Sequence, residues 1–178
     1  VNVTDMGAYE YQGCVNGVIH VDHAASGLGT GSSWADAFTN LSDALLMATS
    51  CPDKEIWVAK GVYTPGLDPG DTFTMTAGVT LYGGFAATET LRTERNWNAN
   101  VTVLSGDIDN NDIKTPTGVV TATDNLRGSN ADHVLWLDGV TSAMTSGTVL
   151  DGFTVTAGNA TTYFRNGGGI YCDGYGNG

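Results

Sequence analysis

Basic residues are scarce in this chain. Seven Lys and Arg stand against nineteen Asp and Glu in 178 residues, and the formal net charge is −12. This balance argues against nucleic acid as a partner, because phosphate contacts need a basic patch. No run approaches the roughly 20 apolar residues of a membrane-spanning helix, and no P-loop or dinucleotide fingerprint is present. The sequence therefore predicts neither a nucleic-acid partner nor a membrane span.

Glycine, by contrast, is abundant, with 25 residues. Glycine suits tight corners and β-branched residues such as the many Thr suit pleated surfaces, so the composition predicts a mostly β fold. Most of the acidic residues are Asp, which favours turns and caps over helix interiors. The length is enough for one domain with a substantial core.

One segment has helical spacing. Its apolar residues recur at intervals of three and four, which places them on one face of a helix. Ser32 or Ser33 is positioned to cap this helix, Asp36 lies in its first turn, and Pro52 marks its end. The face is formed by Trp34, Ala37, Phe38, Leu41, Ala44, Leu45 and Ala48.

After Pro52, short apolar runs alternate with Gly and Asp. Four runs share a Leu-x-Gly core at irregular spacing: Leu81-Tyr82-Gly83, Leu104-Ser105-Gly106, Leu137-Asp138-Gly139 and Leu150-Asp151-Gly152. A solenoid of stacked strands with loop insertions accounts for this pattern. A sandwich of short strands accounts for it equally well.

A family resemblance favours the solenoid. The motifs "IHVDHAASGLGTGSSWADAF", "EIWVAKGVYTP", "GVTLYGGF", "TVLSGDIDNND" and "GGGIYCDG", with the segments between them, resemble the amino-terminal part of secreted bacterial proteins of the pectin-lyase-like superfamily. The resemblance covers roughly residues 18 to 174. It implies a right-handed parallel β-helix with irregular loop insertions, in which the early helix caps one end. Residues 14–52 are then the cap strand and capping helix, and residues 53–178 the β-helix rungs.

Residues 1–13, "VNVTDMGAYEYQG", look like the close of a domain. The block "DMGAYE" is similar to the terminal motif with which choice-of-anchor Q proteins close a β-helix. We expect these residues to form a leading strand that pairs between chains, with Val3, Met6, Tyr9 and Tyr11 in the assembly contact. In an extended strand, Met6 and Ala8 share one face.

The segment "GDIDNNDIK" predicts a calcium site. Asp107, Asp109, Asn111 and Asp112 provide oxygen ligands on a short loop, which is what Ca²⁺ requires. The EF-hand pattern is incomplete, because it lacks the glycine at the sixth position and the glutamate at the twelfth. An acidic surface turn is the alternative.

Catalytic groups are not evident. Arg92, Arg95, Arg127 and Arg165 pair with no acid cluster on a predicted strand, and Asp138, Asp151 and Asp173 precede glycines at expected corners. In "HVDH", His20 and Asp22 would share a strand face while His23 points away, which does not favour a metal site.

Two of the three cysteines are predicted to form a disulfide. A strand from Cys14 to Asp22 spans about 26 Å and a helix of about 15 residues returns about 22 Å, so Cys14 and Cys51 could meet. The bridge would fit an oxidising, extracellular location. The bridge would leave Cys172 over, either buried in a strand row or paired with a group outside this chain. Three separate buried thiols are the alternative.

Four Asn-x-Ser/Thr triplets permit glycosylation, at Asn2, Asn40, Asn100 and Asn159. The abundance of Ser and Thr makes several such triplets expected by chance.

These observations predict a non-catalytic, extracellular structural module, either in an adhesin-like cell-surface protein or as the subunit of a head-to-tail fibre. Its partners would be other copies of itself or neighbouring β-helix repeats. The alternative is a carbohydrate-binding or pectate-lyase-like protein acting on polysaccharide. An exposed row of aromatic side chains would favour this alternative. Candidates for that row are Tyr63, Tyr82, Trp136 and Tyr171.

Overall fold

The computed structural model describes residues 17–51, 54–161 and 168–174, and in that part the strands form three parallel sheets. The first sheet contains, in spatial order, β1 (Ile19–Val21), β2 (Glu55–Ala59), β5 (Thr80–Phe85) and β8 (Val149–Asp151). The second contains β3 (Gly61–Tyr63), β6 (Thr102–Ser105) and β9 (Phe153–Thr156). The third contains β4 (Phe73–Thr76), β7 (Leu135–Gly139) and β10 (Ile170–Gly174).

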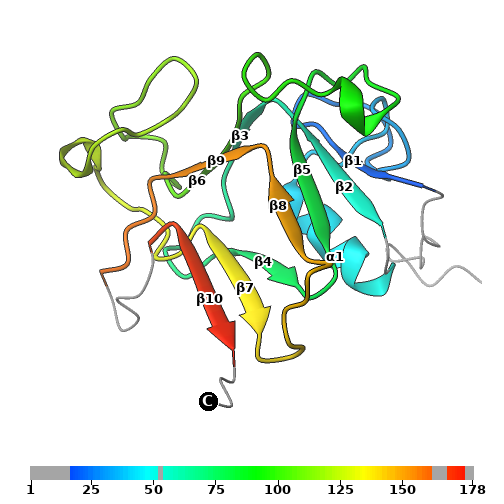
Figure 1. The fold of residues 1–178 in the computed structure, drawn as a ribbon. Helices are drawn as coiled ribbons and strands as arrows, with labels where there is room; N and C mark the ends of the chain where they lie inside the picture. The colour runs from blue at the N-terminus through cyan, green and yellow to red at the C-terminus, as the bar shows by residue number, and fades with distance from the viewer. Residues whose placement is uncertain (1–16, 52–53, 162–167, 175–178) are drawn as a thin grey trace, which may run out of the picture.

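The chain visits the three sheets in rotation, which makes it a solenoid. Strands β2, β3 and β4 form one coil, β5, β6 and β7 the next, and β8, β9 and β10 the last, each stacked on the coil before it (Figure 1). The prediction of a mostly β, parallel solenoid with one short α-helix is confirmed.

The core consists of side chains that point into the coil and line up from one coil to the next. In the first sheet, Ile56, Leu81 and Leu150 are in register, and in the third sheet Phe73, Leu135 and Ile170 are. Ile56, Leu81, Phe73 and Leu135 are fully buried. Because parallel strands are about 4.8 Å apart, each such row packs its side chains directly on one another.

The outer surface of the first sheet is also apolar. Trp57 and Phe85 stack with ring centroids 4.7 Å apart, and Tyr82 is buried beside them. Trp34 packs against this cluster, and its indole N–H donates to the carbonyl oxygen of Glu89 at 2.9 Å. The connections on either side of the sheet are therefore held against it by aromatic contacts.

Helix α1 (Leu41–Ser50) covers the core at one end of the solenoid, where it packs against β1, β2 and β4. Its buried residues Leu41, Ala44, Leu45 and Ala48 are part of the predicted apolar face. The prediction that the helix begins near Trp34 is wrong. It begins after Asn40, whose side chain accepts a hydrogen bond from the backbone N–H of Ser42 at 2.8 Å.

The segment before α1 extends the first sheet. The backbone N–H of Phe38 donates to the carbonyl of His20 at 3.0 Å, and the N–H of Asp22 donates to the carbonyl of Phe38 at 2.9 Å. His20 also donates its backbone N–H to the carbonyl of Gly31 at 2.9 Å. The outer edge of β1 is thus occupied by backbone groups of the same chain. We call α1 and this covered edge the capped end.

Two long connections lie outside the coil. Residues 86–101 join β5 to β6 and contain the 3₁₀ helix η1 (Arg92–Glu94), and residues 106–134 join β6 to β7 and contain η2 (Thr123–Asn125). Both are irregular insertions of the predicted kind. One Leu-x-Gly motif lies inside β5 and the other three at the carboxyl ends of β6, β7 and β8, so their spacing reflects the lengths of the connections between strands.

Candidate functional site

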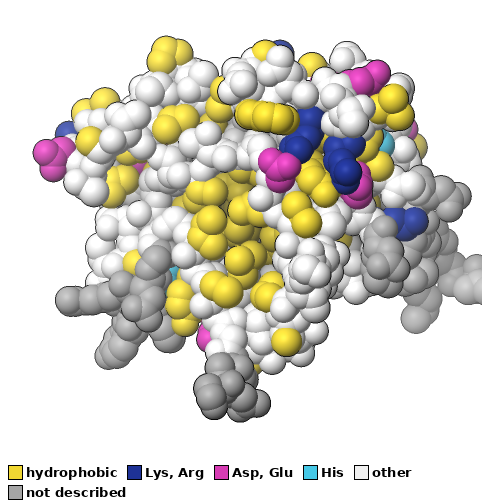
Figure 2. Space-filling view, in the orientation of Figure 1, with side chains coloured by type: hydrophobic (Ala, Val, Ile, Leu, Met, Phe, Trp, Pro, Cys, Tyr) yellow, Lys and Arg dark blue, Asp and Glu magenta, His cyan; other side chains and the backbone are white. Residues whose placement is uncertain are grey.

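Among the described residues nothing covers the core beyond the last coil, and we call this surface the open end. Strands β8, β9 and β10 each pair with only one neighbour among the described residues. Leu137, Leu150, Phe153 and Val155 are only partly buried there, and Ile170 is 41% exposed. Figure 2 shows hydrophobic side chains gathered in the centre of this face, with charged side chains only around them.

The exposure of the open end follows from its register. Ile170 continues the row of Phe73 and Leu135, whereas Cys172 continues the row of Met75 and Leu137. Phe73, Leu135 and Met75 are 0% exposed because a further strand or α1 lies over them. Ile170 and Cys172 occupy equivalent positions with nothing described above them, and Cys172 is an exposed free thiol.

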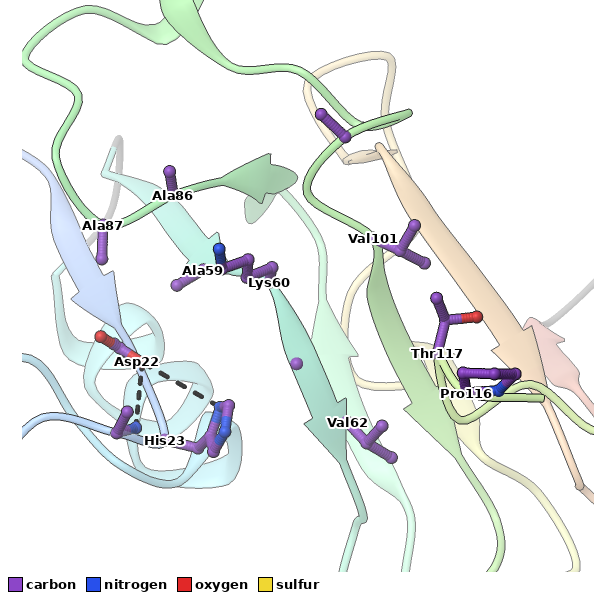
Figure 3. Close-up of a pocket in the computed structure, with 13 residues that line it drawn as sticks. Asp22, His23, Ala59, Lys60, Val62, Ala86, Ala87, Val101, Pro116 and Thr117 are labelled. Carbon is purple, nitrogen blue, oxygen red and sulfur yellow. Dashed lines mark hydrogen bonds and ion pairs between the residues drawn. The ribbon is translucent and has the colours of Figure 1, made fainter. Parts of the chain in front are cut away.

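A groove on the outside of the coil, lined among others by Asp22, Lys60 and Thr117, is a second candidate site. Its volume is about 730 Å³, and we call it the outer groove. Figure 3 shows Asp22 and His23 on one side, Pro116 and Thr117 on the other, and Lys60 between them. The groove follows the corner between the first and second sheets. Its size is within the range of small-ligand sites, and small side chains leave its floor open.

Close backbone approaches shape this groove. A Cβ atom at Gly61 would lie 2.4 Å from the His23 ring, and one at Gly118, where φ is +85°, would lie 2.3 Å from a methyl carbon of Val62. Glycine at these two positions therefore lets His23 and the loop around Thr117 pack closely against β3.

The polar groups of the groove have different environments. Asp22 accepts from the backbone N–H of Ala24 at 2.9 Å and lies 4.0 Å from His23 Nδ1. The His23 ring packs edge-on against Tyr63, where burial raises the pKa of the Tyr63 hydroxyl. Within the described ranges Lys60 forms no ion pair, so its ammonium is available to a ligand.

The sequence did not predict this groove. Asp22 and His23 were considered as metal ligands, but Lys60, Pro116 and Thr117 were not singled out. The groove is assembled from five separate segments of the chain, and only an isolated Lys in a strongly acidic sequence could have drawn attention to it.

The residues of "HVDH" do not form one cluster. His20 lies on the outer face of β1, with its ring 4.6 Å from Trp34 and 5.9 Å from Trp57, and its Nδ1 is 3.2 Å from the carbonyl oxygen of Gly31. Asp22 lies just beyond the strand, and its carboxylate is 4.0 Å from His23 Nδ1.

The predicted calcium ligands are engaged by donors of the same insertion. Asp107 is 3% exposed, accepts from the backbone N–H groups of Asn111 at 2.9 Å and Asp112 at 3.3 Å, and pairs with the Lys114 ammonium. Asp112 accepts from the Arg127 N–H at 2.5 Å and from Asn130 Nδ2 at 2.8 Å. These contacts hold residues 107–130 together as a compact insertion.

Asp109 is exposed and accepts from Asn111 Nδ2 and from the backbone N–H of Ser129, each at 2.8 Å. In the part of the chain that the structure describes, no three His, Cys, Asp or Glu side chains gather closely enough to hold a metal ion. Calcium binding by this loop stays a prediction, which titration of the chelated protein with Ca²⁺ would test.

Two of the three acids at predicted corners, Asp138 and Asp151, have structural partners. Asp138 accepts from the Thr141 hydroxyl at 2.7 Å and from the N–H groups of Thr141 and Val140, and these bonds lower the pKa of its carboxyl. Asp151 pairs with Arg95 at 2.5 Å. Asp173 lies in β10 beside Asp138.

The candidate aromatic row is distributed over all three sheets. Tyr63 and Tyr82 are buried in the second and first sheets, at 4% and 8% exposure. Trp136 and Tyr171 are paired neighbours in the third sheet, and Tyr171 stacks on His133 with centroids 4.8 Å apart. The four side chains therefore do not form one continuous stacking surface.

The remaining predicted positions are only partly within the described residues. Asn40 is exposed, Asn159 is half-buried, and the side-chain amide of Asn100 donates to the carbonyl of Gly84 at 3.2 Å. Cys51 is buried next to α1. Asn2, Val3, Met6, Tyr9, Tyr11, Cys14 and Arg165 lie outside the described residues, so the predicted disulfide and assembly contact stay predictions.

No helix in the described ranges has the length and apolar character needed to span a bilayer. Comparisons with protein-family models, with curated proteins and with solved structures found no match for the chain. What the molecule shares with parallel β-helix proteins is therefore its architecture: three all-parallel sheets whose strands succeed one another around a common core.

Proposed function

We propose that this protein is a non-catalytic, extracellular structural module that stacks end on end with another parallel β-coil. Such a module serves either within a large adhesin-like surface protein or as the subunit of a fibre. The open end is the observation that carries the proposal. It combines three strand edges that have no partner among the described residues with an apolar surface formed by Leu150, Phe153, Val155 and Ile170.

Both features favour a β-coil as the partner. An unpaired strand edge presents backbone N–H and C=O groups that another strand can satisfy. Apolar area gains about 25 cal/mol per Å² when it is removed from water, so covering the patch is favourable. The net charge of −12 opposes association through charged surfaces, which favours the apolar face as the contact.

Sedimentation velocity of the full chain at increasing concentration tests the proposal. We expect species larger than a monomer for the wild type and monomers for the double variant Val155→Lys/Ile170→Lys, which buries two charges at the contact. Val62→Lys is the matched control, because Val62 is 40% exposed but lies in the outer groove. A wild type that stays monomeric throughout, or a control that dissociates equally, would refute the proposal.

The outer groove supports a second candidate function, carbohydrate binding or polysaccharide cleavage. Lys60 provides an unpaired cation for an acidic sugar, and Asp22, His23 and Thr117 provide hydrogen-bonding groups around it. Incubation with a polyuronate and Ca²⁺ tests cleavage by the appearance of unsaturated products. Calorimetry with uronate oligomers tests binding, which Lys60→Met should weaken at least tenfold and Val155→Lys should not affect.

A further inference from the structure

We infer that the open end of one copy is covered by residues 1–13 of a second copy, with Met6 beside Ile170 and Ala8 beside Cys172. This inference rests on the proposed end-on stacking and names its partner segment and register. The occupant adds a parallel strand to the free edge of β10, as in other cases of recognition by strand addition.

The free edge of β10 defines what can cover it. Ile170 and Cys172 are two residues apart and point into the coil, each at the end of a buried row. A covering strand must therefore place two apolar side chains at positions i and i+2 on its inner face. An apolar residue beside Cys172 would continue the row that Met75 and Leu137 begin.

Residues 1–13 meet this requirement. Met6 and Ala8 are separated by Gly7, so an extended strand presents both on one face, and Asp5 and Tyr9 on the other. In this register Tyr9 follows Asp173 on the outer face, where aromatic and polar side chains already alternate as Tyr171 and Asp173. The segment thus continues both faces of the third sheet.

The place of the segment in the chain favours a second copy. Residues 1–16 join the described chain at β1, which belongs to the capped end. Among the described residues the outer edge of β1 is already bonded to Gly31 and Phe38. Residues 1–13 are therefore connected to the end of the molecule that would face the open end of another copy in a stack.

The predicted disulfide would tie the segment to the capped end. Cys51 follows α1 there, and a bridge to Cys14 would hold the carboxyl end of residues 1–13 beside it. Residues 1–13 would span about 43 Å in an extended conformation. This length is ample for one rung of a neighbour stacked on the capped end, and each such contact leaves a new open end, so the stack propagates.

Cysteine trapping in the full chain tests the register. Neighbouring strands are about 4.8 Å apart, which is within the Cα separation of a disulfide. Under mild oxidation we expect Ala8→Cys to bond to the native Cys172 of another copy and to give a ladder of dimers and higher oligomers on non-reducing gels. Gly7→Cys, which points to the opposite face, should give less than a tenth of this product. Adding Cys172→Ser to the first variant should abolish it.

Each outcome decides the inference. Equal cross-linking from positions 7 and 8 refutes the register, and an internally bonded monomer refutes the second copy as the source of the strand. Hydrogen exchange on the unmodified chain provides a second measurement. Protection of the β10 amides should rise with protein concentration, and this rise should vanish when residues 1–13 are deleted. If the chain sediments as oligomers without either signal, the stacking proposal stands and this inference fails.

Discussion

At the scale of single residues, Arg95 holds an insertion against the coil. Its guanidinium lies 5.0 Å from the ring centroid of Tyr82 and 5.2 Å from that of Trp97, and its side chain is only 10% exposed. It also donates to the carbonyl oxygen of Gly83 at 3.2 Å and pairs with Asp151. The cation therefore joins the 86–101 connection to two neighbouring coils.

We expect Arg95→Met to lower the free energy of unfolding by about 1–2 kcal/mol, mainly through loss of the partly desolvated cation–π contacts. The ion pair itself contributes less, because Asp151 is half exposed. Urea denaturation measures the change. Arg92→Met is the matched control. Arg92 also lies over Tyr82, at 4.6 Å, but it is 44% exposed, so its loss should cost less than half as much.

His20 makes the stability depend on pH. Desolvation between Trp34 and Trp57 lowers the pKa of its imidazole, with a smaller opposing effect from the hydrogen bond to Gly31. The folded state therefore favours the neutral ring, whereas the unfolded chain takes up a proton near pH 6.5. The stabilisation is complete above about pH 6.5 and is lost as the pH falls through the folded-state pKa.

We expect the midpoint of urea denaturation to fall between pH 7.5 and pH 5.5 in the wild type, and to fall less in His20→Phe. The carboxyls whose pKa values are lowered, Glu94 and Asp138, affect stability only at more acidic pH. The difference between the two proteins in this window therefore reports on His20. An identical pH dependence in both would contradict the assignment.

At the scale of elements, α1 depends on Asn40. The Asn40 side chain is the acceptor for an otherwise unpaired N–H group of the first turn, and it precedes the four residues that pack on the core. Substitution of such a cap by alanine typically costs about 1 kcal/mol.

We expect Asn40→Ala to lower the melting temperature by a few degrees, whereas Asn40→Asp, which keeps an acceptor at the cap, should change it much less. Thermal denaturation followed by circular dichroism measures both. Ser42→Ala removes the same glycosylation triplet without removing the acceptor, so it separates capping from any effect of a glycan. Equal losses in the alanine and aspartate variants would show that Asn40 does not act as the cap.

The start of α1 shows where periodicity fails as a guide. Trp34 and Phe38 fit the helical spacing, but tertiary contacts override it. The Trp34 indole packs on Phe85 and donates to Glu89, and Phe38 adds backbone hydrogen bonds to β1. These partners are distant in sequence or belong to another element, so a local pattern cannot contain them. Leu41, Ala44, Leu45 and Ala48 were predicted correctly because α1 itself buries them.

The solenoid was more predictable than the groove for a related reason. A short apolar run with a leucine followed two residues later by a glycine occurs in each of the three sheets. In the sequence this repeat is visible at Leu81, Leu104 and Leu137. The groove forms where Asp22, Lys60 and Thr117, which come from different coils and connections, lie close together. Their spacing in the sequence does not predict this proximity, because insertion loops of unrelated length bring these residues together.

At the scale of the whole molecule, the cysteines report on the environment in which the chain folds. Cys51 is buried beside α1 and Cys172 is exposed at the open end. Cys14 was predicted to pair with Cys51, which in the chain-entropy model adds about 4 kcal/mol for a loop of this length.

We expect one alkylation when the oxidised chain is denatured without reductant, and three after reduction. Intact-mass analysis and peptide mapping should locate the single adduct on Cys172 and the bridge between Cys14 and Cys51. The double variant Cys14→Ser/Cys51→Ser should unfold at lower urea concentration, whereas Cys172→Ser should not. Three adducts before reduction would show that the bridge does not form.

The stacking of the coils also determines how the molecule would respond to a pulling force. The ladder hydrogen bonds run from coil to coil, so tension along the solenoid axis loads them in series. Three strand pairs join the last two coils and three join the two before them, whereas in the described residues β1 alone pairs with the coil that follows it. Under load the capped end should therefore yield first, at a lower force than the open end, and a cross-link beside α1 would sit where the molecule is mechanically weakest.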